Sequence, residues 1–351
     1  MVAVYITSME AAGKTALCAG IGRKLLDRGV KVGFIVPVQI FEVSSANGNE
    51  DVAFIKETFD LKESDEQLSP IRLSQTELWQ SLTAEVTDFT SKLKQVYRKI
   101  SRSRDVVIME GLGNLGVDKV SDLACYTIAE ALEAMVIIVL RYAPTLDVSK
   151  VAHIGEKLGQ PLGVVINLVP ESKIEEVRLE LPPLFDKAGV KILGILPEVR
   201  SLLGVSVGEL AGILDGEILT SMENADEMVE SVMVGAMTPD PGATYFNRKE
   251  NKAVVVRGDR ADMQLAALET STKCLILTSN LKPLPAVVSQ AQDKHVPIIV
   301  VKQDNSETIA GIEEALVKAS FHNHRKLDIF GSVLDRYFDF GALCSELGLK
   351  A

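Results

Sequence analysis

Residues 8 to 15 have the types and the spacing of a phosphate-binding loop. Their sequence, SMEAAGKT, fits the pattern GxxxxGK[ST] at every position except the first, where Ser8 replaces glycine. Backbone N–H groups of Ala12, Gly13 and Lys14 would surround a β-phosphate at a helix N-terminus, where the helix dipole also favours an anion. Lys14 would reach the β- and γ-phosphates, and the hydroxyl of Thr15 would ligate Mg²⁺. The alternatives are a chance match at a helix start and a loop that no longer binds.

A carboxylate at the end of another apolar run supports the same interpretation. Residues 105–109 (DVVIM) are expected to form a strand, and Glu110 and Gly111 follow it directly. Ligands of open α/β sheets bind at the carboxyl ends of parallel strands, so Glu110 is placed to hold Mg²⁺ directly or through water. The alternative is a solvated acid that only closes a strand.

Short β-branched runs alternate with amphipathic stretches through the first two hundred residues. Such repeated βα units predict an α/β fold with a doubly wound, mostly parallel sheet. The pattern breaks in a glycine-containing stretch over 197–216, after which a second α/β series begins. We therefore expect a P-loop nucleotide-binding domain over 1–200 and a smaller α/β domain over 215–351.

Charge and composition argue against several classes of protein. The net charge of −11 argues against sequence-independent binding of nucleic acid, which needs a basic face. The longest apolar runs, such as Met135–Leu140, are far shorter than a membrane span. The four cysteines are scattered in neither a zinc nor a disulfide pattern, so we expect buried thiols in a cytoplasmic protein. Neither a membrane nor a nucleic acid is an expected partner.

The four histidines show no spacing typical of metal ligands with carboxylates. We expect none of them to have a chemical role. His322 and His324, together with Arg325 and Lys326, are expected to form a small basic, solvated turn.

The phosphate loop belongs to a wider resemblance to dethiobiotin synthetase. Residues 7–15 resemble that family's long phosphate loop, and residues 109–113 (MEGLG) resemble its acidic strand end. Residues 49–53 (NEDVA) are similar to the segment whose aspartate binds Mg²⁺, which nominates Asp51 as a metal ligand. Asn167 is similar to the family's adenine-reading asparagine, and an amide can pair with both N6 and N7 of adenine. The alternative for Asn167 is a turn residue that ends a strand.

The chain departs from that family at two positions. Ser8 stands at a loop position where glycine takes positive φ more freely. Dethiobiotin synthetases carry a Lys-Pro-Val segment after the second strand, whereas this chain has Val36 at the lysine position. A cation that stabilises transferred phosphoryl charge contributes strongly to catalysis. Ligase activity would need a lysine from elsewhere, with Lys31 and Lys56 as candidates.

The second half of the chain resembles the DRTGG domain. Residues 233–239 (MVGAMTP), 257–262 (RGDRAD) and 277–283 (LTSNLKP) carry this resemblance, although the name-giving motif is only partly present. In many long phosphate acetyltransferases this module follows a P-loop-like domain and precedes the catalytic domain. The whole chain resembles that N-terminal part, and its length leaves no room for an acetyltransferase domain.

A ligand pocket is expected in the second domain, where two neighbouring strands end. Asp259 and Arg260 follow one strand, and Thr278 and Asn280 end the next. Arg260 would pair with a phosphate, and Asp259 would cap the following helix. The alternative is a helix cap together with a structural ion pair.

These features favour a nucleotide-binding protein, for ATP or another nucleotide with Mg²⁺, in a regulatory or ligand-sensing role. A small-molecule effector is expected at the second domain. One alternative is an ATP-dependent carboxylase or amide ligase of the dethiobiotin synthetase and cobyrinic acid diamide synthase group. Another is an accessory subunit of acyl-phosphate metabolism that acts on a separate acetyltransferase. Relatives of both halves tend to pair, which implies a homo-oligomer.

Overall fold

The chain forms two compact units in the computed structural model. The structure describes residues 2–40, 50–83, 89–113, 115–159, 161–235, 242–317 and 321–349. The first unit comprises Met1–Glu198 and Phe321–Ala351, and the second comprises Val199–Ser320. In chain order the second unit is therefore an insertion into the first. This differs from the division expected from sequence, which placed all of 215–351 in the second domain.

The first unit is built on a six-stranded sheet in which all neighbouring strands are parallel. In order across the sheet, its strands are β2 (Val32–Ile35), β5 (Val106–Glu110), β1 (Val2–Ser8), β6 (Met135–Arg141), β7 (Pro161–Val169) and β8 (Ile192–Pro197). The strands are mostly aliphatic and buried, as in a sheet covered on both faces. A short parallel ribbon pairs β3 (Gln39–Ile40) with β4 (Arg72–Leu73). The expected α/β, doubly wound, mostly parallel fold is confirmed.

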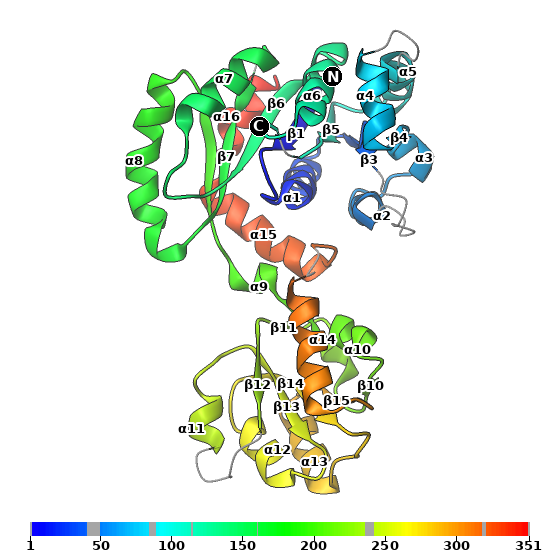
Figure 1. The fold of residues 1–351 in the computed structure, drawn as a ribbon, viewed down its shortest axis with the longest axis vertical. Coiled ribbons are helices and arrows are strands. Elements are labelled where there is room, and N and C mark those ends of the chain that lie inside the picture. The colour runs from blue at the N-terminus through cyan, green and yellow to red at the C-terminus, as the bar shows by residue number, and fades with distance from the viewer. Residues whose placement is uncertain are drawn as a thin grey trace. The chain divides into compact units, whose positions relative to one another are not determined.

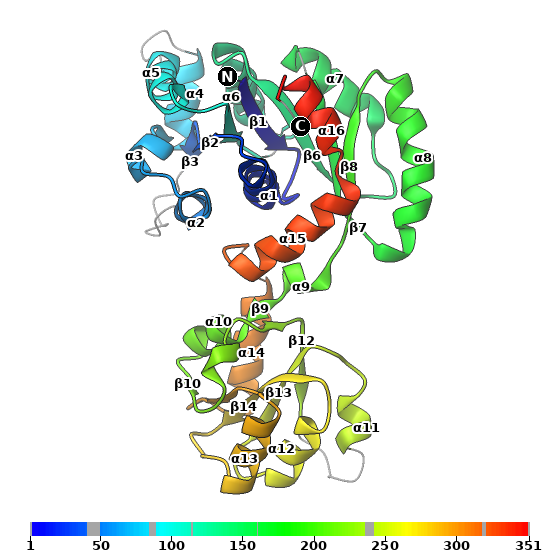
Figure 2. The same cartoon turned by 180° about the vertical axis from the view of Figure 1, so that it is seen from behind.

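Helices flank this sheet, with α1 and α15 side by side on one face (Figures 1 and 2). The helices of the first unit are α1 (Lys14–Asp27), α2 (Glu50–Thr58), α3 (Asp65–Leu68), α4 (Gln75–Thr83), α5 (Phe89–Ser101), α6 (Lys119–Ala131), α7 (Val148–Leu158), the 3₁₀ turn η1 (Glu171–Lys173), α8 (Ile174–Lys187), α15 (His324–Tyr337) and α16 (Phe340–Glu346). The sequence predicts one helical stretch over residues 75–101. The structure has α4 and α5 there, and residues 84–88 lie outside its described part.

The last described segment returns to the first unit and packs on α1 and β8. Phe330 and Leu334 of α15 lie against Gly20 of α1, where an added Cβ would come within 2.6 Å of Leu334. The N–H of Asp339 donates to the carbonyl of Leu193 in the edge strand β8 over 2.8 Å. The sequence also predicts a further helix in the tail from Leu327. The structure has two helices, α15 and α16, in this region, and both belong to the first unit. They cover an edge that would otherwise expose unpaired backbone groups.

The second unit has a five-stranded sheet of its own. Across the sheet the order is β10 (Glu217–Ile218), β15 (Ile298–Val300), β14 (Thr272–Thr278), β13 (Lys252–Arg257) and β12 (Ser231–Val234), with β10 antiparallel and the others parallel. A ribbon pairs β9 (Val205–Ser206) with β11 (Met228–Val229). The sequence predicts one strand over residues 228–236. The structure has β11 and β12 there, and Ala236 lies outside the described residues.

The helices of the second unit surround two buried aliphatic clusters. They are α9 (Arg200–Leu203), α10 (Val207–Ile213), the 3₁₀ turn η2 (Met222–Asn224), α11 (Gly242–Phe246), α12 (Ala261–Leu268), α13 (Pro285–Asp293) and α14 (Asn305–Val317). All four cysteines of the chain are free and buried, as expected. Among the helices in the described ranges, none has the length and apolar character needed to cross a membrane.

Leu334→Ala tests the packing of α15 on α1. It removes a fully buried side chain, so we expect the first unit to lose about 2–5 kcal/mol of unfolding free energy. Trp79, the single tryptophan, lies in the first unit, so its fluorescence during urea unfolding reports on that unit. The control is Leu179→Ala, because Leu179 is 77% exposed and its loss should change stability by less than about 0.5 kcal/mol. Equal urea midpoints of unfolding for Leu334→Ala and Leu179→Ala would contradict this packing role.

Candidate functional site

The phosphate loop leads from the end of β1 into α1, as its sequence predicts. Gly13 is the N-cap residue of α1 and takes the left-handed conformation, with φ at 84°. An added Cβ there would also lie 2.9 Å from Nδ2 of Asn167. Glycine is therefore needed at this position both for its backbone conformation and for the space it leaves.

Ser8 fits the opening of the loop without backbone strain. It is the last residue of β1, pairs with Val139 of β6, and is not one of the residues with positive φ. Its hydroxyl donates to the carbonyl of Glu10 over 2.6 Å and accepts from Nζ of Lys14 over 3.2 Å. The serine that replaces glycine therefore gives Lys14 a hydrogen-bond partner.

Glu110 meets Thr15 at the carboxyl ends of β5 and β1. The Thr15 hydroxyl donates to Oε1 of Glu110 over 2.7 Å. Glu110 is only 8% exposed, and its Oε2 is buried without a hydrogen-bond partner in the described structure. Burial, and after it the charge of Asp51, raises the pKa of Glu110 to about 7. The alternative of a solvated acid at this strand end is therefore wrong.

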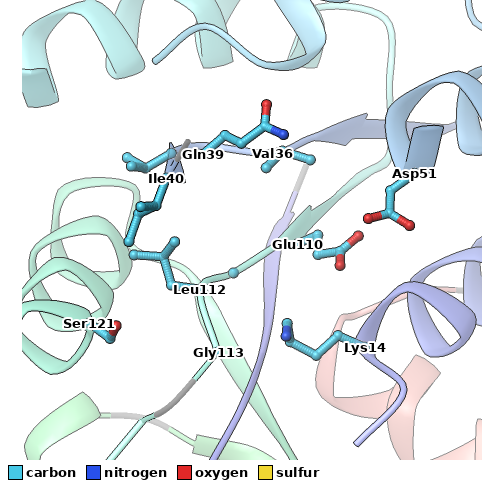
Figure 3. Close-up of a pocket in the computed structure, with 11 residues that line it drawn as sticks. Lys14, Val36, Gln39, Ile40, Asp51, Glu110, Leu112, Gly113 and Ser121 are labelled. Atoms are coloured by element: carbon cyan, nitrogen blue, oxygen red, sulfur yellow. The ribbon is translucent and has the colours of Figure 1, made fainter. Parts of the chain in front are cut away.

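A cavity of about 290 Å³ lies beside the loop. Lys14, Asp51 and Glu110 line it, and Figure 3 shows their charged ends converging from three different elements. The other described lining residues are uncharged: Val36, Val38, Gln39, Ile40, Gly111, Leu112, Gly113 and Ser121. Among the described lining residues, Lys14 alone carries a positive charge.

The oxygen atoms at this site fit a Mg²⁺ ion. A buried carboxylate oxygen without a partner, on Glu110, lies close enough to Asp51 for the two charges to interact. In the part of the chain that the structure describes, no group of three or more His, Cys, Asp or Glu residues could hold a metal by itself. Mg²⁺ commonly binds through one or two carboxylates together with substrate phosphates and water. Thr15, Asp51 and Glu110 would therefore hold it jointly with a nucleotide, and the ion would neutralise phosphate and carboxylate charge.

Asn167 supports the phosphate loop from the neighbouring strand β7. Its Nδ2 donates to the carbonyl of Ala12 over 2.9 Å, and its Oδ1 accepts from the N–H of Leu168. Leu168 has φ at 60°, an unusual conformation for leucine, at the point where the register of β7 with β8 shifts between Ile166 and Val169. Asn167 is absent from the described lining of the cavity, and its reading of adenine stays a prediction.

His322 and His324 lie against α2, where each faces a carboxylate. The side chain of His324 is 60% exposed, as a solvated turn predicts, whereas that of His322 is 19% exposed. Nε2 of His322 is 2.6 Å from Oδ1 of Asp51, and Nε2 of His324 is 3.4 Å from Oε1 of Glu57. The hydrogen bond to Asp51 raises the pKa of His322. Lys326, from the same basic run, is fully buried. The expected basic, solvated turn is confirmed for His324 and Arg325, which are exposed, and is wrong for His322 and Lys326. His322, which contacts Asp51, is a residue that sequence reasoning missed.

The residue that stands where dethiobiotin synthetases have lysine lies beside the cavity. Val36 lines the cavity and brings no charge to it. Lys31 precedes β2 and so lies at the amino end of the sheet, whereas the loop lies at the carboxyl ends. Lys56 forms an ion pair with Asp65 at 2.8 Å. Neither of the two candidate lysines lines the cavity.

The four residues proposed for a pocket in the second unit share one sheet edge. Arg257 and Thr278 are register partners at the ends of β13 and β14, so the two following loops are neighbours. Asp259 pairs with Arg257 at 3.2 Å, and Arg260 pairs with Asp262 at 2.9 Å. The hydroxyl of Thr278 donates to Asn305, and Asn280 has φ at 54°.

The alternative for this edge, a helix cap together with a structural ion pair, holds in part. The N-cap residue of α12 is Arg260, with no side-chain cap hydrogen bond, so the expected cap by Asp259 is wrong. The ion pairs that this alternative includes are present. A ligand at this edge stays a prediction.

Two family matches account for most of the chain. Residues 3–205, more than half of the sequence, match the AAA_26 family, which is described as an AAA domain. The chain belongs to this AAA domain family. After the AAA domain, residues 209–315 match the DRTGG domain, as the resemblance implies. The described segment 321–349 lies outside both matches.

Named relatives fall into two groups. The AAA domain region is 26% identical over 207 residues to an ATP-dependent dethiobiotin synthetase of Methanococcus vannielii, covering 56% of this chain and 94% of that one. Phosphate acetyltransferases of Synechocystis sp. and Pseudomonas aeruginosa are each 20% identical, over 88% and 96% of this chain. The chain spans about half the length of these acetyltransferases, 46% and 50%. Both resemblances are thereby confirmed, the second as one to an N-terminal part of the acetyltransferases.

Solved structures similar to about half of this chain include two proteins. One is a GTPase of Pyrococcus abyssi in the apo form, 16% identical, covering 56% of this chain and 90% of that chain, with a TM-score of 0.33. The other is the CBS and DRTGG regulatory region of Clostridium perfringens pyrophosphatase with its activator diadenosine tetraphosphate. It is 18% identical and covers 49% of this chain and 71% of that chain, with a TM-score of 0.29. At these TM-scores the likeness carries no argument about function.

Glu110→Gln tests the electrostatic state of the site, with neither nucleotide nor Mg²⁺ present. The raised pKa means that the folded protein keeps this proton to a higher pH than the unfolded chain does. Stability is therefore lost as pH rises from the ordinary value of 4.5 to about 7. Removing the charge should raise the free energy of unfolding by on the order of 3 kcal/mol at pH 8 and by much less at pH 5.

Urea unfolding followed by Trp79 fluorescence measures this difference. The control is Glu180→Gln, which changes an exposed carboxylate of α8 in the same unit. Equal stabilities of Glu110→Gln and the wild type at pH 8 would show that the buried carboxylate carries no such penalty.

Proposed function

We propose that the first unit binds ATP or another nucleotide together with Mg²⁺, and that this binding serves a regulatory or ligand-sensing role. The observation that carries the proposal is that Glu110 meets Lys14 and Thr15 of a loop whose sequence fits phosphate binding. Lys14 would neutralise the β- and γ-phosphates, and Ala12 and Gly13 would contribute backbone N–H groups. The dethiobiotin synthetase relative, which is named as ATP-dependent, supports ATP as the nucleotide.

The uncharged part of the cavity favours binding over turnover. Transfer of a phosphoryl group needs positive charge close to the transferred oxygens. Val36 stands where dethiobiotin synthetases have lysine, and in the described lining Lys14 is the single cation. Asp51 and Glu110 add negative charge on the same side, which Mg²⁺ would offset. The site is therefore better suited to hold a nucleotide than to move its phosphate.

The second unit would supply the sensing function. A small-molecule effector would bind at the carboxyl edge of its sheet, beside Asp259, Arg260, Thr278 and Asn280. The adjacent loops at this edge support that placement. Assembly as a homo-oligomer in the cytoplasm completes the proposal.

An ATP-dependent carboxylase or amide ligase is the second candidate function. It is favoured by the match to dethiobiotin synthetase over nearly all of that enzyme and by a cavity next to the phosphate loop. The accessory-subunit alternative is favoured by phosphate acetyltransferases that match most of this chain and only half of their own. Recovery of a separately encoded acetyltransferase by co-purification would discriminate it.

Lys14→Ala tests nucleotide binding directly. We expect the affinity for MgATP, measured by isothermal titration calorimetry, to fall about ten- to a hundredfold, since a hydrogen-bonded charge contributes about 1.5–3 kcal/mol. Lys31→Ala is the matched control, because Lys31 is an exposed lysine at the opposite end of the sheet. No binding by the wild type, or equal binding by the wild type and Lys14→Ala, would sink the proposal.

ADP release separates binding from ligation. With MgATP and either diaminopelargonate plus bicarbonate or a corrinoid plus glutamine, we expect the wild type to release no more ADP than Lys14→Ala does. The reason is the absence of a second cation among the described residues that line the cavity. ADP release that depends on either substrate pair would support the ligase instead.

A further inference from the structure

His322 reaches the nucleotide site from the far end of the chain. Its Nε2 lies 2.6 Å from Oδ1 of Asp51, and its Nδ1 lies 3.6 Å from Oε2 of Glu50. The side chain of His322 is 19% exposed, against 44% for Asp51. The imidazole is thus held more firmly by its surroundings than the carboxylate that it contacts.

Aromatic packing fixes the position of His322. The ring of Phe54, on α2, lies 5.7 Å from the ring of His322 and 5.6 Å from that of His324. Phe321 packs edge-on against both Phe54 and Phe330. The segment that carries His322 is therefore anchored to α2 on one side and to α15 on the other.

The same segment contacts both helices that supply the site. Helix α15 follows His322 within two residues and packs on α1, which begins at Lys14 and Thr15. Helix α2 presents Asp51 in its first turn. His322 lies beyond residues 3–205 and 209–315, so it belongs to neither the matched AAA domain nor the matched DRTGG domain.

A half-exposed aspartate needs an external partner to keep one orientation. Asp51 is close enough to Glu110 for repulsion between the carboxylates, and His322 interacts electrostatically with both. The imidazole of His322, donating to Oδ1, fixes the orientation of the Asp51 carboxylate and leaves Oδ2 for another ligand. Outer partners of this kind orient metal-binding carboxylates and commonly change metal affinity 10- to 100-fold, as an order of magnitude.

We propose that His322 is a positioning residue for Mg²⁺ in the nucleotide site: it holds Asp51 by one oxygen so that the other faces the metal. This inference rests on the proposed binding of nucleotide with Mg²⁺. It adds that metal binding depends on the return of the C-terminal segment to the first unit. His322 touches neither nucleotide nor metal in this arrangement and acts through Asp51.

The test is the Mg²⁺ concentration that gives half-maximal tightening of ATP binding, in the wild type and in three variants. His322→Ala should raise this concentration about 10- to 100-fold. His322→Gln, which keeps an N–H donor at a similar reach, should recover most of the loss. His324→Ala is the matched control, because His324 packs on the same Phe54 but pairs with Glu57. ATP affinity without Mg²⁺ should be equal in all four proteins.

A double-mutant cycle shows whether His322 acts through Asp51. In an Asp51→Ala background, His322→Ala should add less than about a twofold further shift, because the residue that it positions is gone. Full additivity of the two changes would overturn the inference.

Other outcomes also separate the possibilities. An unchanged or lower Mg²⁺ midpoint for His322→Ala would overturn the inference, the latter by showing that His322 competes with the metal. A loss of Mg²⁺-free ATP affinity in both His322→Ala and His324→Ala would assign the segment a packing role only and would overturn the inference too. Failure of the wild type to bind ATP at any Mg²⁺ concentration would instead refute the proposed function, and the inference with it.

Discussion

The carboxylate of Glu110, which is buried at the end of β5, constrains the chemistry of the first unit. One of its oxygens accepts a hydrogen bond from Thr15, and the other has no partner in the described structure. A buried ionised carboxylate is unfavourable unless hydrogen bonds or a cation compensate it, which explains its raised pKa. The strand order makes this meeting unavoidable, because β5 lies directly beside β1 and both carboxyl ends face the loop. A divalent ion that arrives with phosphates would supply such compensation.

The C-terminal segment provides the second constraint. It packs on α1, contacts α2 through aromatic rings and ion pairs, and covers the edge strand β8. The first unit is thereby assembled from residues on both sides of the second unit in the chain. Any change that displaces this segment would remove packing from the two helices that carry Lys14 and Asp51. The site at the phosphate loop and the integrity of the first unit are therefore physically linked.

Features that depend on local pattern were predictable from the sequence. The phosphate loop, the strand that ends in Glu110 and the parallel α/β architecture follow from spacing, from apolar runs and from the rule that ligands collect at strand ends. Asp51 could be nominated through resemblance, and it does line the cavity. A glycine pattern alone gives no backbone angles, so sequence could not show that Ser8 suits its position as the end of a strand.

Features that depend on distant contacts were not predictable. His322 and Asp51 are 271 positions apart, and no periodicity relates them. The tail helices have apolar faces that pack against α1 and β8, but helical spacing does not say which unit an amphipathic helix joins. Likewise, the strand-end position of Asn167 gave no sign that its amide would hold the carbonyl of Ala12. In each case the partner is set by tertiary packing.

The most direct test of the central claim, a nucleotide and Mg²⁺ held at this loop, is a crystal structure of the full chain grown with Mg²⁺ and a non-hydrolysable ATP analogue. The account predicts the β-phosphate within the loop at Ala12, Gly13 and Lys14, with the metal beside Thr15, Asp51 and Glu110 and with Asp51 still bonded to His322. Absence of density at the loop in crystals grown at saturating analogue, or phosphates bound elsewhere, would contradict it.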